Sequence, residues 1–271
     1  MRKRRFAVCA ALLLALCVAF ASCGAYQKTE TVVYVITKGT SSDFWKSVRA
    51  GVSAAAVENG VTAIFEGPAN EEDYATQNRM IDEAVEAGAD AIVFSAIDRY
   101  ATKKHLEDAV RRGVKVILID SSADTEMAEC FIGTDNYAAG KMVCEAVLDG
   151  MGTDTPLKVG LVNYDENTEN GSSREAGFRD RAAEAENIEI VASVHVASDT
   201  DIAKLTAMSM MREHPDINVL VGFNEWMTLG VGYAMQELGT AAGVYAVGFD
   251  SNVQSVAMLE TGEMDALIVQ N

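Results

Sequence analysis

Helical stretches alternate along this chain with short, uninterrupted apolar runs. Three of the helical stretches end in a glycine that an apolar run follows at once, in "ENGVTAIFEG", "EAGADAIVFS" and "RRGVKVILID". Glycine readily adopts the left-handed conformation that closes a helix, so Gly60, Gly88 and Gly113 are predicted helix ends. The apolar runs lack the alternation of half-exposed strands, which predicts strands covered on both faces. This order of elements is typical of a parallel sheet with helices on both sides.

The pattern occurs in two series. The first begins with "TVVYVIT" at residues 31–37, and the next helix should pack through Phe44, Val48 and Val52. The second follows "ECFIGTDNYAAG", and its strands are predicted at "LKVGLVNY", "IEIVASVHV", "INVLVGFN", "VYAVGFD" and "DALIVQ". Two sheets are more usual than one very wide sheet. We therefore expect an α/β protein of two similar lobes, each a parallel sheet flanked by helices, with boundaries at 31–133 and 134–271 and a crossing near 133–136.

The N-terminal segment has the features of an export signal. A basic start at residues 2–5 precedes an uncharged apolar run at 6–20, which is short for a membrane span. Two small residues then precede Cys23, as in a bacterial lipobox, although a phenylalanine replaces the usual leucine three positions before the cysteine. We expect 1–22 to be a signal peptide and Cys23 to be lipidated at the head of a tether, 23–30. The protein would then be anchored at the outer face of the cell membrane or be periplasmic; the alternative is a soluble secreted product cleaved nearby.

Composition limits the kinds of molecule that the protein is expected to bind. The 271 residues include 22 Lys and Arg against 40 Asp and Glu, a formal net charge of −18. This excess indicates a solvated surface and argues against nucleic acid, which needs a basic patch. After removal of the signal and lipidation, Cys130 and Cys144 remain as thiols. Export permits a disulfide, but we expect two separate buried thiols, because Cys144 falls in a helical pattern and Cys130 in a short strand.

Signatures of catalysis are missing from the sequence. The loop after the first strand has only Gly39, whereas a phosphate-binding loop needs several glycines. None of the three histidines stands in a triad or zinc-binding context. "DENTENG" departs from a calcium loop, because its glycine is one place late and Ala176 occupies position twelve. We expect no enzyme activity, no cofactor and no metal site.

Polar and aromatic residues follow the predicted strands, at the edge where open parallel sheets bind ligands. In the first lobe they include Ser42, Phe44, Trp45, Ser95, Asp98, Asp120 and Ser121, and in the second the stretch 163–174 with Ser172 and Arg174, then Asn224, Asp250 and Gln270. Carboxylates and amides suit a hydroxyl-rich ligand because each engages neighbouring hydroxyls, and aromatic faces suit the C–H faces of a sugar ring. A cleft between two lobes is a favoured place for such a site.

Each candidate has a structural alternative. The aspartates and the asparagine can cap helices, Arg174 can serve in an ion pair, and the aromatic residues can belong to the core. The capping candidates are Asp120, Asp250 and Asn224, the core candidates are Phe44 and Trp45, and Trp226 is expected at the rim or in packing.

Seven segments together resemble one family. They are "SSDFWKSVRAGV", "VILIDS", "IGTDNYAAGK", "SSREAGFRD", "GFNEWMTLGV" and "VGFD" with the later "ALIVQ". In this order they resemble type I periplasmic binding proteins of the ribose-binding, sugar-importer class, from about Thr31 to Gln270. The resemblance implies ligand contacts at Asp120, Asn224, Asp250 and Gln270 and a hinge at Asp135 and Asn136. Arg174 matches the arginine of the family's RxxGF segment.

The function that the resemblance implies is capture of a small sugar or polyol between two lobes and its delivery to the permease of an ABC importer. Such a protein works as a monomer and needs no cofactor. The alternatives are a surface sensor that passes ligand occupancy to a receptor kinase, and a binder of a nucleoside or another non-sugar solute. A sugar-responsive repressor would carry a helix-turn-helix head where this chain has its signal segment.

The chain departs from ribose binders at two positions and at its end. Ser121 and Ser172 stand where ribose binders have arginines, so another sugar, a polyol or a less polar solute is expected. Members of the family continue beyond the strand that ends at Gln270, with a segment that returns to the first lobe. We therefore expect the sequence to Asn271 to be a fragment.

Overall fold

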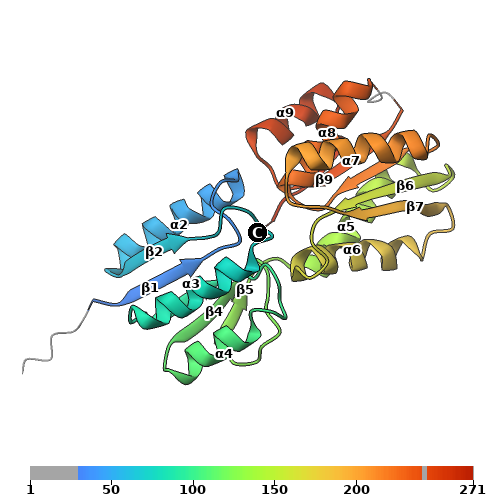
Figure 1. Ribbon diagram of the computed structural model, residues 1–271. Coiled ribbons are helices and arrows are strands. Elements are labelled where there is room, and N and C mark those ends of the chain that lie inside the picture. The colour runs from blue at the N-terminus through green and yellow to red at the C-terminus, as the bar shows by residue number, and fades with distance from the viewer. Residues whose placement is uncertain (1–29, 240–242, 271) are drawn as a thin grey trace, which may run out of the picture. The chain divides into compact units, whose positions relative to one another are not determined.

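Two five-stranded parallel sheets, each with helices on its faces, form the protein in the computed structural model, which describes residues 30–239 and 243–270 (Figure 1). This is the α/β architecture of two similar lobes that the sequence predicts. Both lobes belong to one compact unit that begins at Val32.

The first lobe contains five strands and three helices. Its strands are β1 (Val32–Ile36), β2 (Thr62–Glu66), β3 (Ala91–Phe94), β4 (Lys115–Ile119) and β5 (Cys130–Ile132), in the order β2-β1-β3-β4-β5. Its helices are α2 (Asp43–Asn59), α3 (Tyr74–Glu86) and α4 (Lys103–Arg111). Because connections between parallel strands are right-handed, α2 lies on one face and α3 and α4 lie on the other.

The second lobe repeats this strand order. Its strands are β6 (Leu157–Asn163), β7 (Ile188–His195), β8 (Val219–Gly222), β9 (Tyr245–Phe249) and β10 (Ala266–Ile268), in the order β7-β6-β8-β9-β10. Its helices are α5 (Asn136–Met151), α6 (Glu169–Ala182), α7 (Thr200–Glu213), α8 (Glu225–Leu238) and α9 (Val253–Thr261). In each sheet the chain's first strand therefore lies between its second and third, and the order reverses beside it.

Helix ends fall where the sequence places them. Gly60, Gly88 and Gly113 all have positive φ angles, of 61°, 85° and 92°, as the helix–glycine–strand pattern predicts. The chain crosses from the first lobe to the second between β5 and α5. There the Asp135 side chain caps α5 by accepting the backbone N–H of Ala138 at 2.9 Å.

The two sheets differ in their coverage. In the second lobe all four residues of β8 are buried, within a core that Leu161, Phe178 and Met235 share. In the first lobe β4 alternates between buried and less buried residues, and all three residues of the edge strand β5 are exposed. The prediction of strands covered on both faces therefore holds for the central strands β6, β8 and β9 of the second sheet, but not for its edge strand β7, which has no buried residue. It holds only in part for the first sheet, where α2 buries only Trp45 completely.

The cysteine prediction is half correct. Cys130 and Cys144 are both free thiols, as expected, and burial raises the pKa of Cys144 to about 11. Cys130, however, is exposed, because it lies on the uncovered edge strand β5. The expectation that both thiols are buried is thus wrong for Cys130.

Strand register brings the ends of several strands to one edge. Ile36 of β1 pairs with Glu66 of β2 and Phe94 of β3, and Phe94 pairs with Leu118 of β4. The residues that follow these strands therefore emerge side by side. In open parallel sheets the crevice for a ligand forms at this edge, where the strand order reverses.

Candidate ligand-binding site

A cavity lies where the reversal points of both sheets meet. Its empty volume is about 290 Å³, part of which is open solvent. The lining residues follow strand ends in both lobes: Lys38, Ser42, Phe44, Trp45, Glu71 and Asp120 from the first, and Tyr164, Asn170, Arg174, Asn224, Glu225, Trp226, Asp250 and Gln270 from the second.

Asp120 holds its carboxylate in the cavity through an uncommon backbone conformation. It directly follows β4 with φ of 55°, in the left-handed region that side chains other than glycine rarely adopt. The Ser95 hydroxyl donates to its Oδ2 at 2.8 Å, and the Asn170 amide donates to its Oδ1 at 3.1 Å. The helix-capping alternative for Asp120 does not apply, because the next element is the strand β5.

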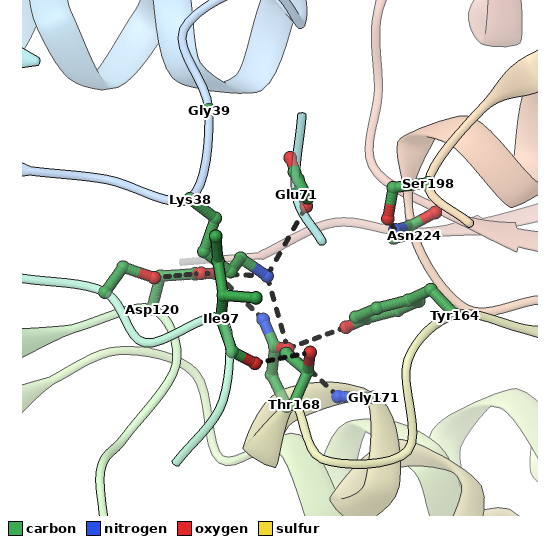
Figure 2. Close-up of polar contacts among 12 residues, drawn as sticks. Lys38, Gly39, Glu71, Ile97, Asp120, Tyr164, Thr168, Gly171, Ser198 and Asn224 are labelled. Atoms are coloured by element: carbon green, nitrogen blue, oxygen red, sulfur yellow. Dashed lines mark hydrogen bonds and ion pairs between the residues drawn. The ribbon is translucent and has the colours of Figure 1, made fainter. Parts of the chain in front are cut away.

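Lys38 brings a buried positive charge to the same place. Its Nζ lies 3.5 Å from Asp120 Oδ2 and 3.8 Å from Glu71 Oε2, and it donates to Asn170 Oδ1 at 3.4 Å (Figure 2). Burial on its own lowers the pKa of Lys38, but Asp120 and Glu71 outweigh burial and hold that pKa above its ordinary value. Lys38 is therefore a charged, fixed donor.

Arg174 organises the wall of the second lobe. The side chain is 1% exposed and donates from Nε to Asn136 Oδ1 at 2.9 Å, from Nη1 to the Phe223 carbonyl at 2.7 Å and from Nη2 to Gln270 Oε1 at 2.6 Å. Close packing of α5 on α6 permits this arrangement, since a Cβ at Gly140 would collide with the Arg174 carbonyl oxygen. Arg174 thus orients Gln270 and ties the predicted hinge residue Asn136 to the cavity wall.

Asp250 is the counterpart of Asp120 in the second lobe. It directly follows β9 with φ of 68°, and Gln270 Nε2 donates to its Oδ1 at 2.6 Å. Burial raises the pKa of the Asp250 carboxyl, and Arg174 and Gln270 only partly offset this. It is not the cap of α9, which is Asn252. The carboxylate therefore faces the cavity with less compensation than an exposed one would have in water.

Direct contacts link the two lobes around the cavity. Asn170 from α6 reaches Lys38 and Asp120, the Thr168 hydroxyl donates to the Ile97 carbonyl at 2.8 Å, and the Ser198 N–H donates to Glu72 Oε1 at 2.6 Å. Figure 2 shows Thr168 of the second lobe in contact with the Ile97 carbonyl of the first, and the Tyr164 ring near the Lys38 ammonium group. Burial raises the pKa of Tyr164 to about 12, so the phenol stays a neutral donor to Asn170 Oδ1 at 2.8 Å.

Four aromatic side chains line the cavity: Phe44, Trp45, Tyr164 and Trp226. Phe44 packs edge-on against Trp45 with ring centroids 4.8 Å apart, and Trp226 enters from α8. Trp45 is buried and Trp226 is half-buried. Trp45 is therefore both a core residue and a cavity residue, because its ring is buried and still borders the cavity.

Most of the predicted site residues come together in this cavity. Those that line it are Ser42, Phe44, Trp45, Asp120, Arg174, Asn224, Asp250 and Gln270. Ser42 and Asn224 also cap α2 and α8, accepting the backbone N–H groups of Trp45 and Met227. Ser121 and Ser172 are not among the described residues that line it.

The two serines lie elsewhere for geometric reasons. Ser121 is fully buried, and its hydroxyl has no partner among the described residues. Ser172 is half-buried, and its hydroxyl donates to the Glu169 carbonyl at 3.0 Å. Neighbours along a strand end point apart, and residues two apart on a helix do not share a face. The side chains of Ser121 and Ser172 are thus directed away from the cavity.

Sequence reasoning did not select Lys38, Glu71 and Glu225 of the lining, and it included Tyr164 and Asn170 only as members of the stretch 163–174. Lys38 and Tyr164 stand within two residues of strand ends, so the strand-end rule applied more strictly would include them. Glu71 comes from the loop after β2, and Glu225 follows the predicted Asn224. Their roles depend on partners distant in sequence, for which the pattern carries no signal.

The described ranges contain neither a metal-binding cluster nor a membrane-spanning helix. No group of three or more His, Cys, Asp or Glu side chains there is placed to hold a metal ion. No helix in the described ranges has the length and apolar character to cross a bilayer. The predicted signal peptide and Cys23 lie outside the described residues.

Comparisons with known proteins agree with this geometry. A D-ribose/D-allose-binding protein of Pseudomonas aeruginosa is 27% identical over 241 residues, covering 86% of this chain and 74% of that protein. A carbohydrate transporter solute-binding protein of Agrobacterium radiobacter, solved with D-arabinose, is 25% identical with a TM-score of 0.86 and covers 90% of this chain and 83% of its own. An ABC transporter solute-binding protein of Agrobacterium vitis with bound D-fucose is 28% identical with a TM-score of 0.84, covering 87% and 82%.

The family model described as the periplasmic binding protein domain matches residues 33–271, which is almost the whole chain from β1 onward. The match spans both sheets and every described residue of the cavity lining. The chain belongs to the periplasmic binding protein domain family.

Proposed function

We propose that this protein is an extracytoplasmic solute-binding protein that closes on a small neutral sugar or polyol and delivers it to an ABC importer. One observation carries the proposal: polar side chains from the reversal points of both sheets surround a common cavity, with Asp120 and Asp250 presented on left-handed backbones from opposite lobes. The role is binding rather than catalysis.

The lining favours a ligand rich in hydroxyl groups. Carboxylates and amides at Asp120, Asp250, Asn224 and Gln270 supply acceptors and donors for vicinal hydroxyls, and the aromatic rings supply apolar faces. Each nitrogen of Arg174 already donates one hydrogen bond within the protein, so only two of its five N–H groups are left for a ligand. A sugar bound here would meet mainly acids and amides.

The charge of the lining favours a neutral ligand over an anion. Four carboxylates, at Glu71, Asp120, Glu225 and Asp250, accompany only two cations, Lys38 and Arg174. Inside a poorly hydrated cavity a phosphate or carboxylate on the ligand would meet net repulsion. The relatives named for D-ribose and D-allose, and those solved with D-arabinose and D-fucose, support a monosaccharide.

The location follows from family and sequence. We propose export through the segment 1–22 and anchoring by a lipid on Cys23, with the protein acting as a monomer beside its permease. Lipidation is tested by expressing the full chain and its Cys23→Ser variant in bacteria and locating each by membrane fractionation. The unaltered chain should sediment with membranes and the variant should not; equal partitioning contradicts the anchor.

A thermal-shift screen tests the binding function. The protein is heated with monosaccharides, polyols, nucleosides, amino acids and a sugar phosphate in turn. A ligand at about 100 times its dissociation constant should stabilise the folded state by roughly 2.7 kcal/mol. A shift with a neutral sugar or polyol supports the proposal, whereas a shift confined to a nucleoside or an anion overturns it. Permease genes beside this one favour import, and a lone receptor kinase gene favours sensing.

A further inference from the structure

We infer that Glu71 is a positioning residue that fixes two tryptophan rings, one from each lobe, together with the Lys38 ammonium group, in the geometry that receives the ligand. The inference rests on the proposed sugar-binding function. Glu71 lies in the loop between β2 and α3, outside the elements whose ends supply the predicted ligand contacts.

The two indole groups converge on a single oxygen. Trp45 Nε1 donates to Glu71 Oε1 at 2.8 Å, and Trp226 Nε1 donates to the same oxygen at 3.5 Å. Trp45 comes from α2 of the first lobe and Trp226 from α8 of the second. An indole has one N–H donor, so this contact fixes the ring edge and leaves the faces for apolar contact with a sugar.

The other carboxylate oxygen of Glu71 holds Lys38. Glu71 Oε2 lies 3.8 Å from Lys38 Nζ, which Asp120 contacts from the opposite side (Figure 2). Glu71 and Lys38 are 9% and 4% exposed, so each charge depends on the other for compensation. Without Glu71 the ammonium would be drawn toward Asp120 and Asn170, and its position in the cavity would change.

The loop is packed so that Glu71 keeps this place. Gly67 follows β2 directly, and a Cβ there would lie 2.9 Å from the Thr37 carbonyl oxygen. The same carbonyl accepts the Gln77 side chain at 3.0 Å, which joins the start of α3 to the end of β1. The loop that carries Glu71 is therefore anchored against the end of β1 on both sides, at Gly67 and Gln77. The Glu71 side chain then acts on the ligand through Trp45, Trp226 and Lys38.

The chain's only two tryptophans are these two residues, so their fluorescence reports on this contact. Glu71→Ala removes both acceptors, whereas Glu71→Gln keeps an oxygen for the Trp45 indole and removes the charge beside Lys38. Each is made in a Trp226→Phe background, which leaves Trp45 as the only emitter. Glu58→Gln, on the exposed side of α2, is the matched control.

The first measurement needs no ligand. Acrylamide quenching of Trp45 should increase in Glu71→Ala and stay near the parent value in Glu71→Gln and in the control. Equal quenching in the parent and Glu71→Ala overturns the inference, as does Glu71→Gln behaving like Glu71→Ala. If Glu71→Ala does not fold by circular dichroism, Glu71→Asp replaces it, because the shorter side chain withdraws the oxygen from the indole.

The second measurement titrates D-allose and D-ribose into chains that retain both tryptophans. Glu71→Ala should weaken binding about tenfold or more, the usual effect of losing hydrogen bonds to a charged group, and Glu71→Gln should weaken it less. Unchanged affinity in Glu71→Ala overturns the inference. If neither sugar binds the parent protein, the proposed ligand is in error, and the quenching result still decides the role of Glu71.

Discussion

Two aspartates with the same uncommon backbone conformation, one from each lobe, line the site. Asp120 and Asp250 each follow a strand directly, and they are the only described residues other than glycine with positive φ. Such conformations raise the energy of the folded chain and persist where function requires them. The pair supports the proposal that each lobe presents a carboxylate to one ligand.

Two substitutions of Asp120 separate the contribution of its charge to binding from the contribution of its backbone conformation to stability. Asparagine tolerates the left-handed conformation, so Asp120→Asn should fold normally and bind sugar about ten- to a hundredfold more weakly, since a hydrogen bond to a charged group contributes roughly 1.5–3 kcal/mol. Asp120→Ala should bind as weakly and also unfold more easily, by about 1 kcal/mol, because alanine disfavours this conformation. Calorimetric titration and thermal unfolding measure the two effects. Equal stability of the two variants would show that the backbone at Asp120 is unstrained.

Asp250 should oppose folding at neutral pH. Burial raises the pKa of its carboxyl in the folded state, so ionisation destabilises that state at every pH above the raised value. Asp250→Asn should therefore raise the ligand-free Tm at pH 7 while abolishing tight binding. The gain in Tm should shrink as the pH falls through the raised pKa toward the ordinary aspartate value. The parent carboxyl is then protonated and therefore neutral, like the asparagine amide of the variant. A gain that is constant from pH 7 to pH 4 would assign it to packing instead.

The sequence predicts well which residues follow the strands and line the cavity, but it predicts poorly which other side chains contact them. Asp120, Asn224, Asp250 and Gln270 reach the cavity because strand ends share one edge of a sheet. Ser121 does not, because the turn at Asp120 directs its neighbour into the interior. Glu71 and Lys38 were not predicted from the sequence. Glu71 matters through its contacts with Lys38 and with two tryptophans that are distant in sequence.

The N-terminus of α2 is completed by the opposite lobe. Ser42 accepts the N–H of Trp45, and the Glu225 carboxylate of α8 accepts the N–H groups of Asp43 at 3.1 Å and Phe44 at 3.0 Å. Asn252 holds Glu225 in place by donating at 3.0 Å. An anion at a helix N-terminus is favoured by the unpaired N–H groups and the helix dipole. This contact can form only when the lobes are together.

Neutralising Glu225 should therefore speed opening. Glu225→Gln retains the side-chain length but offers one acceptor, so the closed form should lose roughly 1 kcal/mol and the ligand should dissociate about fivefold faster. Stopped-flow tryptophan fluorescence measures that rate. Glu237→Gln, exposed on the same helix, should leave it unchanged. An unaltered dissociation rate in Glu225→Gln would mean that this contact contributes nothing to closure.

The order of elements was predictable from glycine-terminated helices and apolar runs, but their coverage was not. The exposed β5 and the partly covered β4 depend on which helices reach each face of the first sheet, and strand composition alone does not reveal this. The contact of Glu225 with α2 was equally hidden, because its acceptors meet backbone groups rather than recognisable side chains.

The whole molecule places its recognition groups on two sheets and joins them by direct contacts. Asn170, Thr168, Ser198 and Glu225 each bond across from the second lobe to the first. A ligand that contacts both lobes adds to these contacts and shifts the population toward the closed form. Affinity should therefore depend on groups from both sheets at once.

Whether sugar affinity depends on both sheets is tested by calorimetric titration of the parent protein and of an Asp120→Asn/Asp250→Asn double variant. The sugars are D-allose, D-ribose, D-arabinose and D-fucose, with ribose 5-phosphate as the anionic comparison. We predict one-to-one binding of at least one neutral sugar to the parent, no binding of the phosphate, and loss of sugar binding in the folded double variant. Binding of the phosphate alone, or sugar binding undiminished in the double variant, would contradict the proposed function.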